Sequence, residues 1–244
     1  MTITEQHYDF KVKADKVDSL KTRNFLPAEI DWLLNIATQE FVDNKYNDFE
    51  TKQDLIDQLS TLTIKCPTVI QPPVSVNLAS PGVYEMRISD LQYPYLHLIR
   101  LNALASKQGC SPKIMKGDEV SHDTLNKVLL SPFEGPNFNW MNLPFVTGRS
   151  TFAETPANSA LYLYTNGEYQ IDEVYPEYLK IPVNVYFGGY NSLDGVYIAG
   201  ITPPINSDLP VAYHRRIVDI AVANASDYIN KPDYAQKLQK TFRQ

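Results

Sequence analysis

The sequence predicts an α+β protein in which the N- and C-terminal segments form a helical bundle and a β-rich, proline-rich insertion lies between them. Three observations support this fold class. Apolar residues recur at helical spacing near both ends, prolines concentrate between residues 67 and 210, and an Asn-Gly turn signal lies in that middle region. We therefore assign residues 1–64 and 205–244 to the helical bundle and residues 65–204 to the insertion, with one short helix near residues 121–130.

The first strongly periodic helix is expected to begin at Pro27, because the first helical position does not need the N–H that proline lacks. Glu29 and Asp31 follow in the first turn, where carboxylates favour the helix dipole. Trp32 lies off the apolar stripe, so we expect it to cover a neighbouring element. The stripe consists of residues at helical spacing: Ile30, Leu33, Leu34, Ala37 and Phe41.

A second helix is expected from about Glu50 to Leu62, with Asp48 as its candidate cap. The chain then changes character, and strands are expected over Tyr84–Ser89 and Tyr95–Ala103. A short helix is expected over Ser121–Leu130, with Ser121 as its cap and an inward face formed by Leu125, Val128 and Leu129.

The region from residue 131 to residue 160 is rich in proline but too apolar for a free linker. Its large aromatic residues need packing partners: Phe133, Phe138, Trp140, Phe145 and Phe152. A hairpin is expected next, because Asn166-Gly167 lies between the alternating segments Leu161–Tyr164 and Tyr169–Val174. A further strand over Tyr178–Val185 contains Pro182, which predicts a sheet edge or a bulge.

The C-terminal helix, expected over Val211–Asn230, has an apolar face well beyond the ~100° of a typical surface helix. Such a helix is usually covered on two sides, by its own core and by another layer or another subunit. One apolar stripe consists of Ile217, Ile220, Ala221, Asn224 and Tyr228. The neighbouring stripe consists of Val218, Val222, Ala225 and Ile229. We predict that this second stripe, together with Trp32, Arg215 and Arg216, contacts another subunit or partner.

The composition describes a globular, acidic protein that makes many contacts. Its 22 Lys and Arg residues against 28 Asp and Glu give a net charge of −6, which argues against a broad face that binds nucleic acid but not against a surface that DNA slides past. The 16 Tyr outnumber the 10 Phe and 2 Trp together, and tyrosine is enriched at interfaces. We expect Cys66 and Cys110 to be free thiols in a reducing cytosol; the alternative is a single disulfide between them.

We expect no signal peptide and no membrane span. The N-terminus lacks a basic region followed by an apolar stretch, and the longest strictly apolar run is Ala160–Tyr164, far short of the roughly 20 residues that a spanning helix needs.

No standard catalytic or cofactor motif occurs in the sequence. It lacks a phosphate-binding GxxxxGK[ST] loop, a GxGxxG fingerprint, HExxH, CxxC and GxSxG. Ser121-His122-Asp123 has the residue types of a catalytic triad, but neighbouring residues at a helix start point in different directions, so capping explains it better. The polar segment Gly188–Gly195 lacks the alternating acidic ligands of a calcium loop. We therefore predict no enzyme, no metal and no cofactor.

His214-Arg215-Arg216 opens the C-terminal helix, where cations oppose the helix dipole. Two explanations remain open. Asp208 and Asp219 offset the positive charge, or an acidic neighbouring chain or a phosphate backbone binds there.

Several blocks of the sequence resemble virion ring proteins of crAss-like phages. In the N-terminal region they are Ala14–Ser19, Arg23–Asn35 and Glu40–Val42. Further along they are His122–Phe133 followed by Pro136, Tyr178–Pro182, Leu209–His214 and Ile217–Ala221. The blocks span most of the chain in the order of that family, whereas residues 65–120 and 186–205 match nothing in it.

The resemblance implies a structural protein of the virion without catalytic residues, made in the cytoplasm of a host bacterium. It implies a dodecameric ring between the portal and the tail, which contacts the portal protein and neighbouring ring or tail proteins. DNA would pass through its lumen without sequence-specific binding. The alternatives are another virion component, such as a tail hub, a fibre attachment or a capsid decoration, and, less favoured, a carbohydrate-binding module that uses Tyr162 or Tyr164, or an enzyme.

Overall fold

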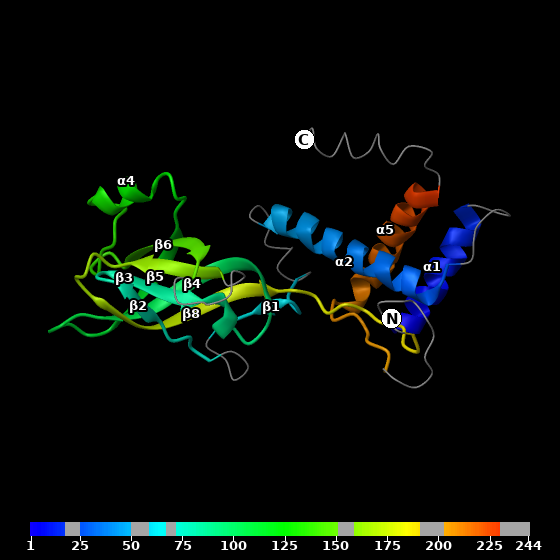
Figure 1. Ribbon diagram of the computed structural model, residues 1–244, viewed down its shortest axis with the longest axis horizontal. Helices are drawn as coiled ribbons and strands as arrows, with labels where there is room; N and C mark the ends of the chain where they lie inside the picture. Colours follow the sequence, from blue (N-terminus) through cyan, green and yellow to red (C-terminus); the bar gives the residue numbers. More distant parts are fainter. Residues whose placement is uncertain (18–24, 50–58, 67–71, 151–158, 191–202, 230–244) are drawn as a thin grey trace. The chain divides into compact units, whose positions relative to one another are not determined.

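The computed structural model describes residues 1–17, 25–49, 59–66, 72–150, 159–190 and 203–229 (Figure 1). The chain divides into two compact units. The helical unit combines Met1–Leu62 with Pro182–Gln244, and the sheet unit consists of Thr63–Ile181.

The described helices of the helical unit are α1 (Ile3–Val17), α2 (Pro27–Phe49) and α5 (Val211–Ile229). Helix α2 begins at Pro27 as predicted, and Glu29 caps it by accepting a hydrogen bond from the backbone N–H of Leu26 (2.9 Å). Helix α5 packs against both α1 and α2. The predicted helix over residues 50–62 falls mostly outside the described residues, and residues 59–62 form a turn.

The core of the helical unit comes from one face of each helix. It contains Ile3, Phe10, Ile30, Leu34, Phe41, Ile217, Val218 and Ala221, each no more than 2% exposed. The apolar stripe predicted for α2 is buried throughout, which confirms that prediction. Helix α1 was not predicted, because its buried face includes the polar residues Gln6 and His7, which weaken the apolar periodicity.

The sheet unit contains eight strands in the order β1-β8-β4-β5-β6-β7-β3-β2, which curl into a half-barrel. All described neighbours are antiparallel except β5 and β6, which are parallel. The strands are β1 (Thr63–Ile64), β2 (Asn77–Ser80), β3 (Val83–Arg87), β4 (Tyr95–Ser106), β5 (Lys113–Glu119), β6 (Asn142–Arg149), β7 (Ser159–Tyr164) and β8 (Gln170–Lys180).

Alternation along the strands builds the core of the sheet unit. In β4, Leu101, Ala103 and Ala105 point inward and are fully buried. They pack with residues of the other strands, among them Met86, Met115, Leu143, Phe145, Leu161, Leu163 and Val174. The sheet unit therefore has a hydrophobic core of its own.

The predicted fold class was wrong. The protein is mixed α/β and dominated by the curled eight-stranded sheet, and it is not a helical bundle that carries an insertion. The physical reason is the core just described. The eight-stranded sheet buries its own apolar face. The middle of the chain therefore forms a unit with a core of its own and does not depend on the helices to bury its apolar residues.

The predicted hairpin was also wrong in its pairing. The strands form near the predicted positions, and Asn166 and Gly167 adopt the expected positive φ angles of 53° and 73°. However, β7 pairs with β3 and β6, whereas β8 pairs with β1 and β4. The turn lies against Gly82, where a Cβ atom would come within 2.9 Å of the backbone nitrogen of Gly167.

Two smaller predictions in the sheet unit need correction. The predicted helix over residues 121–130 is the short α4 (Leu125–Leu130), whose N-cap is Thr124 and not Ser121, and none of its residues is buried. The predicted strand over residues 178–185 is the end of β8, which stops at Lys180. Elsewhere in the sheet unit, a 3-10 helix, η1 (Ile88–Asp90), follows β3.

Candidate interaction surfaces

The apolar stripe predicted to reach another subunit lies inside the helical unit of a single chain. Val218, Val222 and Ala225 are 0%, 9% and 2% exposed. Because α5 packs against α1 and α2, these side chains present almost no surface to a second chain. The side chain of Ile229 lies outside the described residues.

The other three predicted interface residues are on the surface. Trp32 is 52% exposed on α2, and Arg215 and Arg216 are exposed near the start of α5. The guanidinium carbon of Arg216 lies 5.8 Å from the centre of the Phe41 ring, so this cation covers part of the core. The interface role of these residues stays a prediction.

Arg215 lines a groove of about 890 Å³ between α1 and α5. We call it the α1–α5 groove, and its lining residues are Met1, Thr4, Glu5, Tyr8, Asp9, Lys13, Arg215 and Asp219. Lys13 bridges the two helices, with its Nζ atom 2.9 Å from Asp9 and 2.8 Å from Asp219. Burial works to lower the pKa of Lys13, but its hydrogen bonds with Asp219 and Asp9 outweigh this effect and raise it.

A buried carboxylate ties together three segments of the helical unit. Asp31 of α2 is 3% exposed, and its Oδ1 atom lies 2.6 Å from Nε2 of His7 in α1. Its Oδ2 atom accepts hydrogen bonds from the backbone N–H of Phe187 (2.7 Å) and from the hydroxyl of Tyr190. The rings of His7 and Phe187 stack with their centres 4.5 Å apart. We call this set the Asp31 network.

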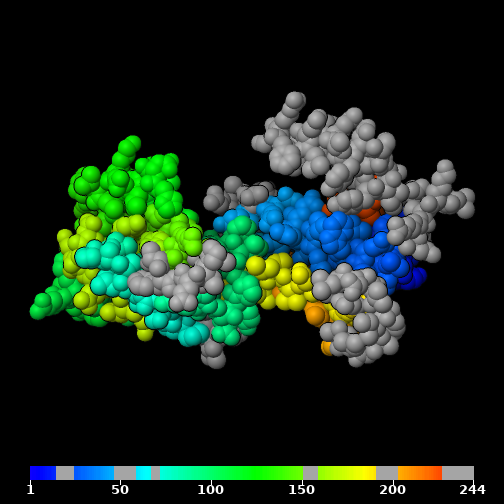
Figure 2. Space-filling model, in the orientation of Figure 1, coloured from blue at the N-terminus to red at the C-terminus, as the bar shows by residue number. Residues whose placement is uncertain are grey.

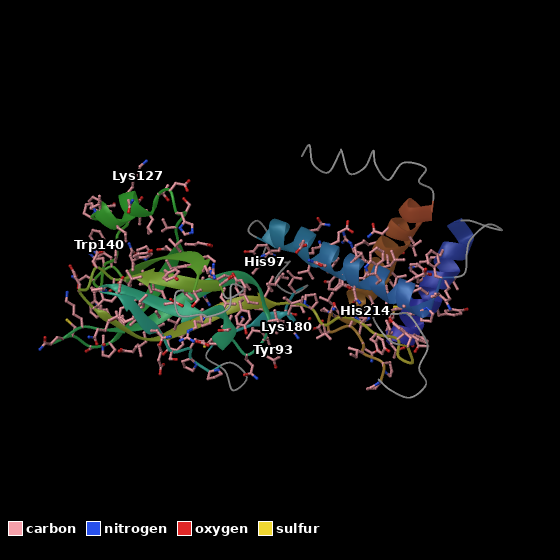
Figure 3. All side chains as sticks on the ribbon, viewed as in Figure 1. Tyr93, His97, Lys127, Trp140, Lys180 and His214 are labelled. Carbon is pink, nitrogen blue, oxygen red and sulfur yellow. The ribbon has the colours of Figure 1, made fainter. Side chains whose placement is uncertain are left out.

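Burial and the hydrogen bond to Asp31 raise the pKa of Tyr190. The Asp31 network contains an Asp–His pair, but each contact we find joins one structural segment to another. His214, labelled in Figure 3, acts similarly: its two ring nitrogens lie 3.1 Å from the carbonyl oxygen of Met1 and 2.8 Å from that of Leu209. These buried polar groups therefore fix the packing of the helical unit.

The sheet unit displays a cluster of large apolar side chains that the sequence did not predict to be exposed. We call Leu130, Phe133, Trp140 and Met141 the aromatic tip; they are 86%, 70%, 52% and 45% exposed. The rings of Phe133 and Trp140 stack with centres 5.6 Å apart and planes 10° apart. Figure 2 shows α4 and the loop after it projecting from the sheet unit, and Figure 3 labels Lys127 and Trp140 there.

The sequence predicted that Phe133 and Trp140 would find partners, as Phe138 and Phe145 do at 2% exposure each. Phe133 and Trp140 instead pair with each other and leave much of their surface to solvent. Phe152, the fifth aromatic residue of that prediction, lies outside the described residues.

The loop that carries the aromatic tip is held by its own hydrogen bonds. The Ser131 hydroxyl accepts from the backbone N–H of Glu134 (3.2 Å), and Oδ1 of Asn137 accepts from the N–H groups of Asn139 (2.8 Å) and Trp140 (3.0 Å). Asn142 donates from its side chain to the carbonyl of Phe133 (3.0 Å). These hydrogen bonds hold the loop in place, so the Phe133 and Trp140 rings are already positioned before a partner binds.

The loop also depends on Gly135. A Cβ atom on this residue would lie 2.6 Å from the carbonyl oxygen of Ser131, closer than real contacts allow. The backbone of the tip loop therefore passes too close to itself for a larger residue.

Ser121 and His122 of the triad-like run have separate partners. Ser121 bonds with Thr124 (2.9 Å) while His122 bonds with the carbonyl of Thr147 (2.9 Å), so the triad-like run does not converge. Among the described residues, no group of three His, Cys, Asp or Glu side chains could hold a metal ion. Burial raises the pKa of Cys66 to about 11, which keeps this thiol protonated near neutral pH.

The two tyrosines considered for sugar binding lie within the sheet. Tyr162 and Tyr164 are half-buried in β7, and the Tyr162 hydroxyl donates to the carbonyl of Arg149. The Tyr162 ring also packs on Gly148, where a Cβ atom would lie 2.9 Å from it. Little of this ring is left for a sugar to stack on.

Comparison with known proteins adds no relative: neither a protein-family model nor a curated protein matches the sequence. In the part of the chain that the structure describes, we find no helix both long and apolar enough to cross a bilayer.

Proposed function

We propose that the chain is a structural virion protein that forms an oligomeric ring at the portal–tail junction of a phage, through which DNA passes. It works by binding its own copies, the portal protein and neighbouring ring or tail proteins, with no turnover. The proposal begins from the resemblance to virion ring proteins of crAss-like phages.

One structural observation supports this proposal most. The blocks that resemble the family at the two ends of the chain meet in one compact unit. Residues of the Arg23–Asn35 block begin α2, and those of the Leu209–His214 and Ile217–Ala221 blocks form much of α5. Asp31, in the first of these blocks, is the centre of the buried Asp31 network.

One surface of the structure and the net charge of the chain suit a protein that works by assembly. The aromatic tip exposes four large apolar side chains, and contiguous exposed apolar patches mark interaction sites. The net charge of −6 suits a channel that must release DNA, because phosphates are held mainly by an excess of basic groups.

The proposal is tested by mixing the purified full chain with the portal protein and measuring the mass of the products by native mass spectrometry. We expect a ring of many copies bound to the portal, with little or no assembly when the portal is omitted. A chain that stays monomeric beside the portal and other virion proteins would contradict the proposal. Cross-links from this chain to receptor-binding proteins in intact virions would instead favour a fibre-attachment role.

A further inference from the structure

We propose that a pocket of the sheet unit, lined by Tyr93 and Tyr95, binds a neutral saccharide. We call it the tyrosine pocket; its volume of about 590 Å³ lies within the roughly 300–1,000 Å³ of small-molecule sites. Every lining residue belongs to Thr63–Ile181, so the site is complete within the sheet unit. The inference goes beyond the proposed ring and does not rest on it.

Strand pairing brings the walls of the tyrosine pocket together. Most of the lining comes from residues 88–95, which contain η1 and the segment that leads into β4. Arg87, at the end of β3, pairs with Ala160 of β7, so η1 begins beside the start of β7. Ser159 of β7 and Thr147 of the neighbouring strand β6 complete the lining.

The two tyrosines are held in place before a ligand binds. The backbone N–H of Tyr93 donates to the hydroxyl of the buried Tyr178 (3.3 Å). The Nζ atom of Lys180 lies 5.5 Å from the centre of the Tyr93 ring, and Figure 3 labels both residues. The rings of Tyr95 and Tyr178 have their centres 6.1 Å apart, and Pro94 restricts the backbone between the two tyrosines. Little ordering is therefore needed when a ligand binds.

The lining offers the two kinds of contact that a sugar ring makes. Tyrosine rings pack against the C–H groups on the face of a sugar, because these rings present a large apolar surface. Hydroxyl and amide groups both donate and accept hydrogen bonds, which suits the hydroxyl groups at the rim of a sugar. The pocket has four residues with such groups: Ser89, Gln92, Thr147 and Ser159.

The hydroxyl groups of the pocket are oriented but not used up. Ser89 donates to a carboxylate oxygen of Asp90 over 3.4 Å. Thr147 donates to Glu119 over the same distance. Each hydroxyl oxygen keeps lone pairs that accept from a hydroxyl group of the ligand.

The charges near the tyrosine pocket favour an uncharged ligand. None of the lining residues that the structure describes has a charged side chain. A phosphate or carboxylate ligand would therefore find no cation in the lining, and a cationic ligand would find no carboxylate there. The side chains just outside have both signs and one imidazole: Asp90 and Glu119 against Arg87, Arg149 and Lys180, with His122 bonded to the Thr147 carbonyl.

A glycan array tests the proposal with the purified full chain. We expect fluorescently labelled chain to bind at least one neutral oligosaccharide, and to bind it more strongly than its sialylated or sulfated counterparts. Titration of that oligosaccharide by saturation-transfer difference NMR should give a Kd on the order of 1 mM, because exposed lining residues enclose a ligand only partly. The absence of binding to any neutral oligosaccharide, or a preference for the acidic ones, would overturn the proposal.

A proline-rich peptide is the competing ligand, since grooves lined by aromatic residues also bind polyproline helices. We therefore titrate decaproline under the same conditions and expect no saturation transfer to it. Decaproline that binds more tightly than every neutral oligosaccharide would overturn the proposal in favour of a peptide site.

Substitutions locate the binding site. Tyr93→Ala and Tyr95→Ala should each raise the Kd about tenfold, because each removes a ring that packs on the sugar. Tyr93→Phe keeps the ring and should change the Kd less than about threefold. Tyr8→Ala is the matched control, since this tyrosine is 73% exposed on the helical unit. Binding that survives both alanine changes in the pocket, or that falls equally with Tyr8→Ala, would contradict the assignment.

Two exposed positions keep the test decisive if far-UV circular dichroism shows that a tyrosine variant does not fold. Gln92→Ala and Thr147→Val remove hydrogen-bonding groups from the lining and should each raise the Kd about three- to tenfold. An unchanged Kd in both variants would overturn the proposal. Saccharide binding is measured without the portal protein, so its outcome is separate from that of the proposed ring.

Discussion

Asp31 is the residue on which the packing of the helical unit depends most. It accepts hydrogen bonds from His7, from the Phe187 backbone and from Tyr190, so one carboxylate joins α1, α2 and the segment that leaves the sheet. A carboxylate buried in this way is stable only while its partners remain. From the sequence, Asp31 was expected in the first turn of a helix, where its charge would interact favourably with the helix dipole. No residue close to it in the sequence indicated its partners elsewhere in the chain.

Asp31→Asn should therefore destabilise the helical unit by about 3 kcal/mol, because the buried donors around residue 31 lose the negatively charged carboxylate and face a neutral amide instead. Urea unfolding followed by circular dichroism at the helical band measures this loss. Asp123→Asn changes an exposed carboxylate in the same way and should change the free energy of unfolding by less than about 0.5 kcal/mol. Equal effects of the two changes would contradict the role of the Asp31 network.

Tyr190 makes the stability of the helical unit sensitive to alkaline pH. In an unfolded chain tyrosine ionises near pH 10, roughly, and in the folded chain burial and the bond to Asp31 raise the pKa of Tyr190. The folded state therefore holds this proton more tightly. The contribution is complete below about pH 10 and is lost as the pH rises from there toward the folded-state pKa.

Tyr190→Phe removes this titration. We expect a shallower fall in the free energy of unfolding of the helices above about pH 10 in the variant than in the unmodified chain. Tyr169→Phe is the control, since burial also raises the pKa of Tyr169 but this residue belongs to the sheet unit. If Tyr190→Phe leaves the alkaline profile of the helices unchanged, Tyr190 does not control it.

At the scale of elements, local chemistry predicts where the chain turns but not which strands pair. Asn166 and Gly167 adopt left-handed φ angles as the sequence predicted. Even so, their flanking strands have different partners, because β3 offers β7 a complete register from Val83 to Arg87. A turn signal contains no information about this distant strand.

The strand β5 was not predicted, because its sequence KIMKGDE has only two apolar residues and so lacks a clear alternation of apolar and polar side chains.

Gly117 marks a position where two strands come unusually close. A Cβ atom there would lie 2.8 Å from Cβ of Leu101 and 2.9 Å from its carbonyl oxygen. Gly117→Ala should destabilise the sheet unit by about 2 kcal/mol through overpacking. Urea unfolding followed by Trp140 fluorescence in a Trp32→Phe background measures the change. Asp118→Ala, at the exposed neighbouring position, is the control and should lower the free energy of unfolding by less than about 0.5 kcal/mol. If Gly117→Ala and Asp118→Ala lower it equally, the close approach at Gly117 is refuted.

At the scale of the whole molecule, the sequence predicted the helices α2 and α5 well because their apolar stripes are strong and local. It did not predict the dominance of the sheet, which depends on pairing between strands far apart in the chain, such as β4 with β8. It also predicted that the second stripe of α5 would contact another subunit, whereas Val218 and Ala225 are buried beneath α1 and α2. A wide apolar face shows that a helix is covered, but not by what.

The sheet unit should fold without the helices, because Thr63–Ile181 contains a complete core. We expect this fragment to unfold cooperatively on heating and to show β-type circular dichroism. The shorter fragment Thr63–Arg149 lacks β7 and β8 and should stay unfolded, since β8 is a long partner of β4. A Thr63–Ile181 fragment that binds the dye ANS and melts without a transition would contradict this independence.

The central claim is that this chain forms a ring between portal and tail, and locating it in a reconstruction of the whole virion tests that claim most directly. Electron cryomicroscopy of virions that contain the protein should show its curled eight-stranded sheet and its helices repeated in a dodecameric ring that encloses the DNA channel below the portal. Copies found only on tail fibres or on the capsid surface, or virions that lack the chain, would contradict it.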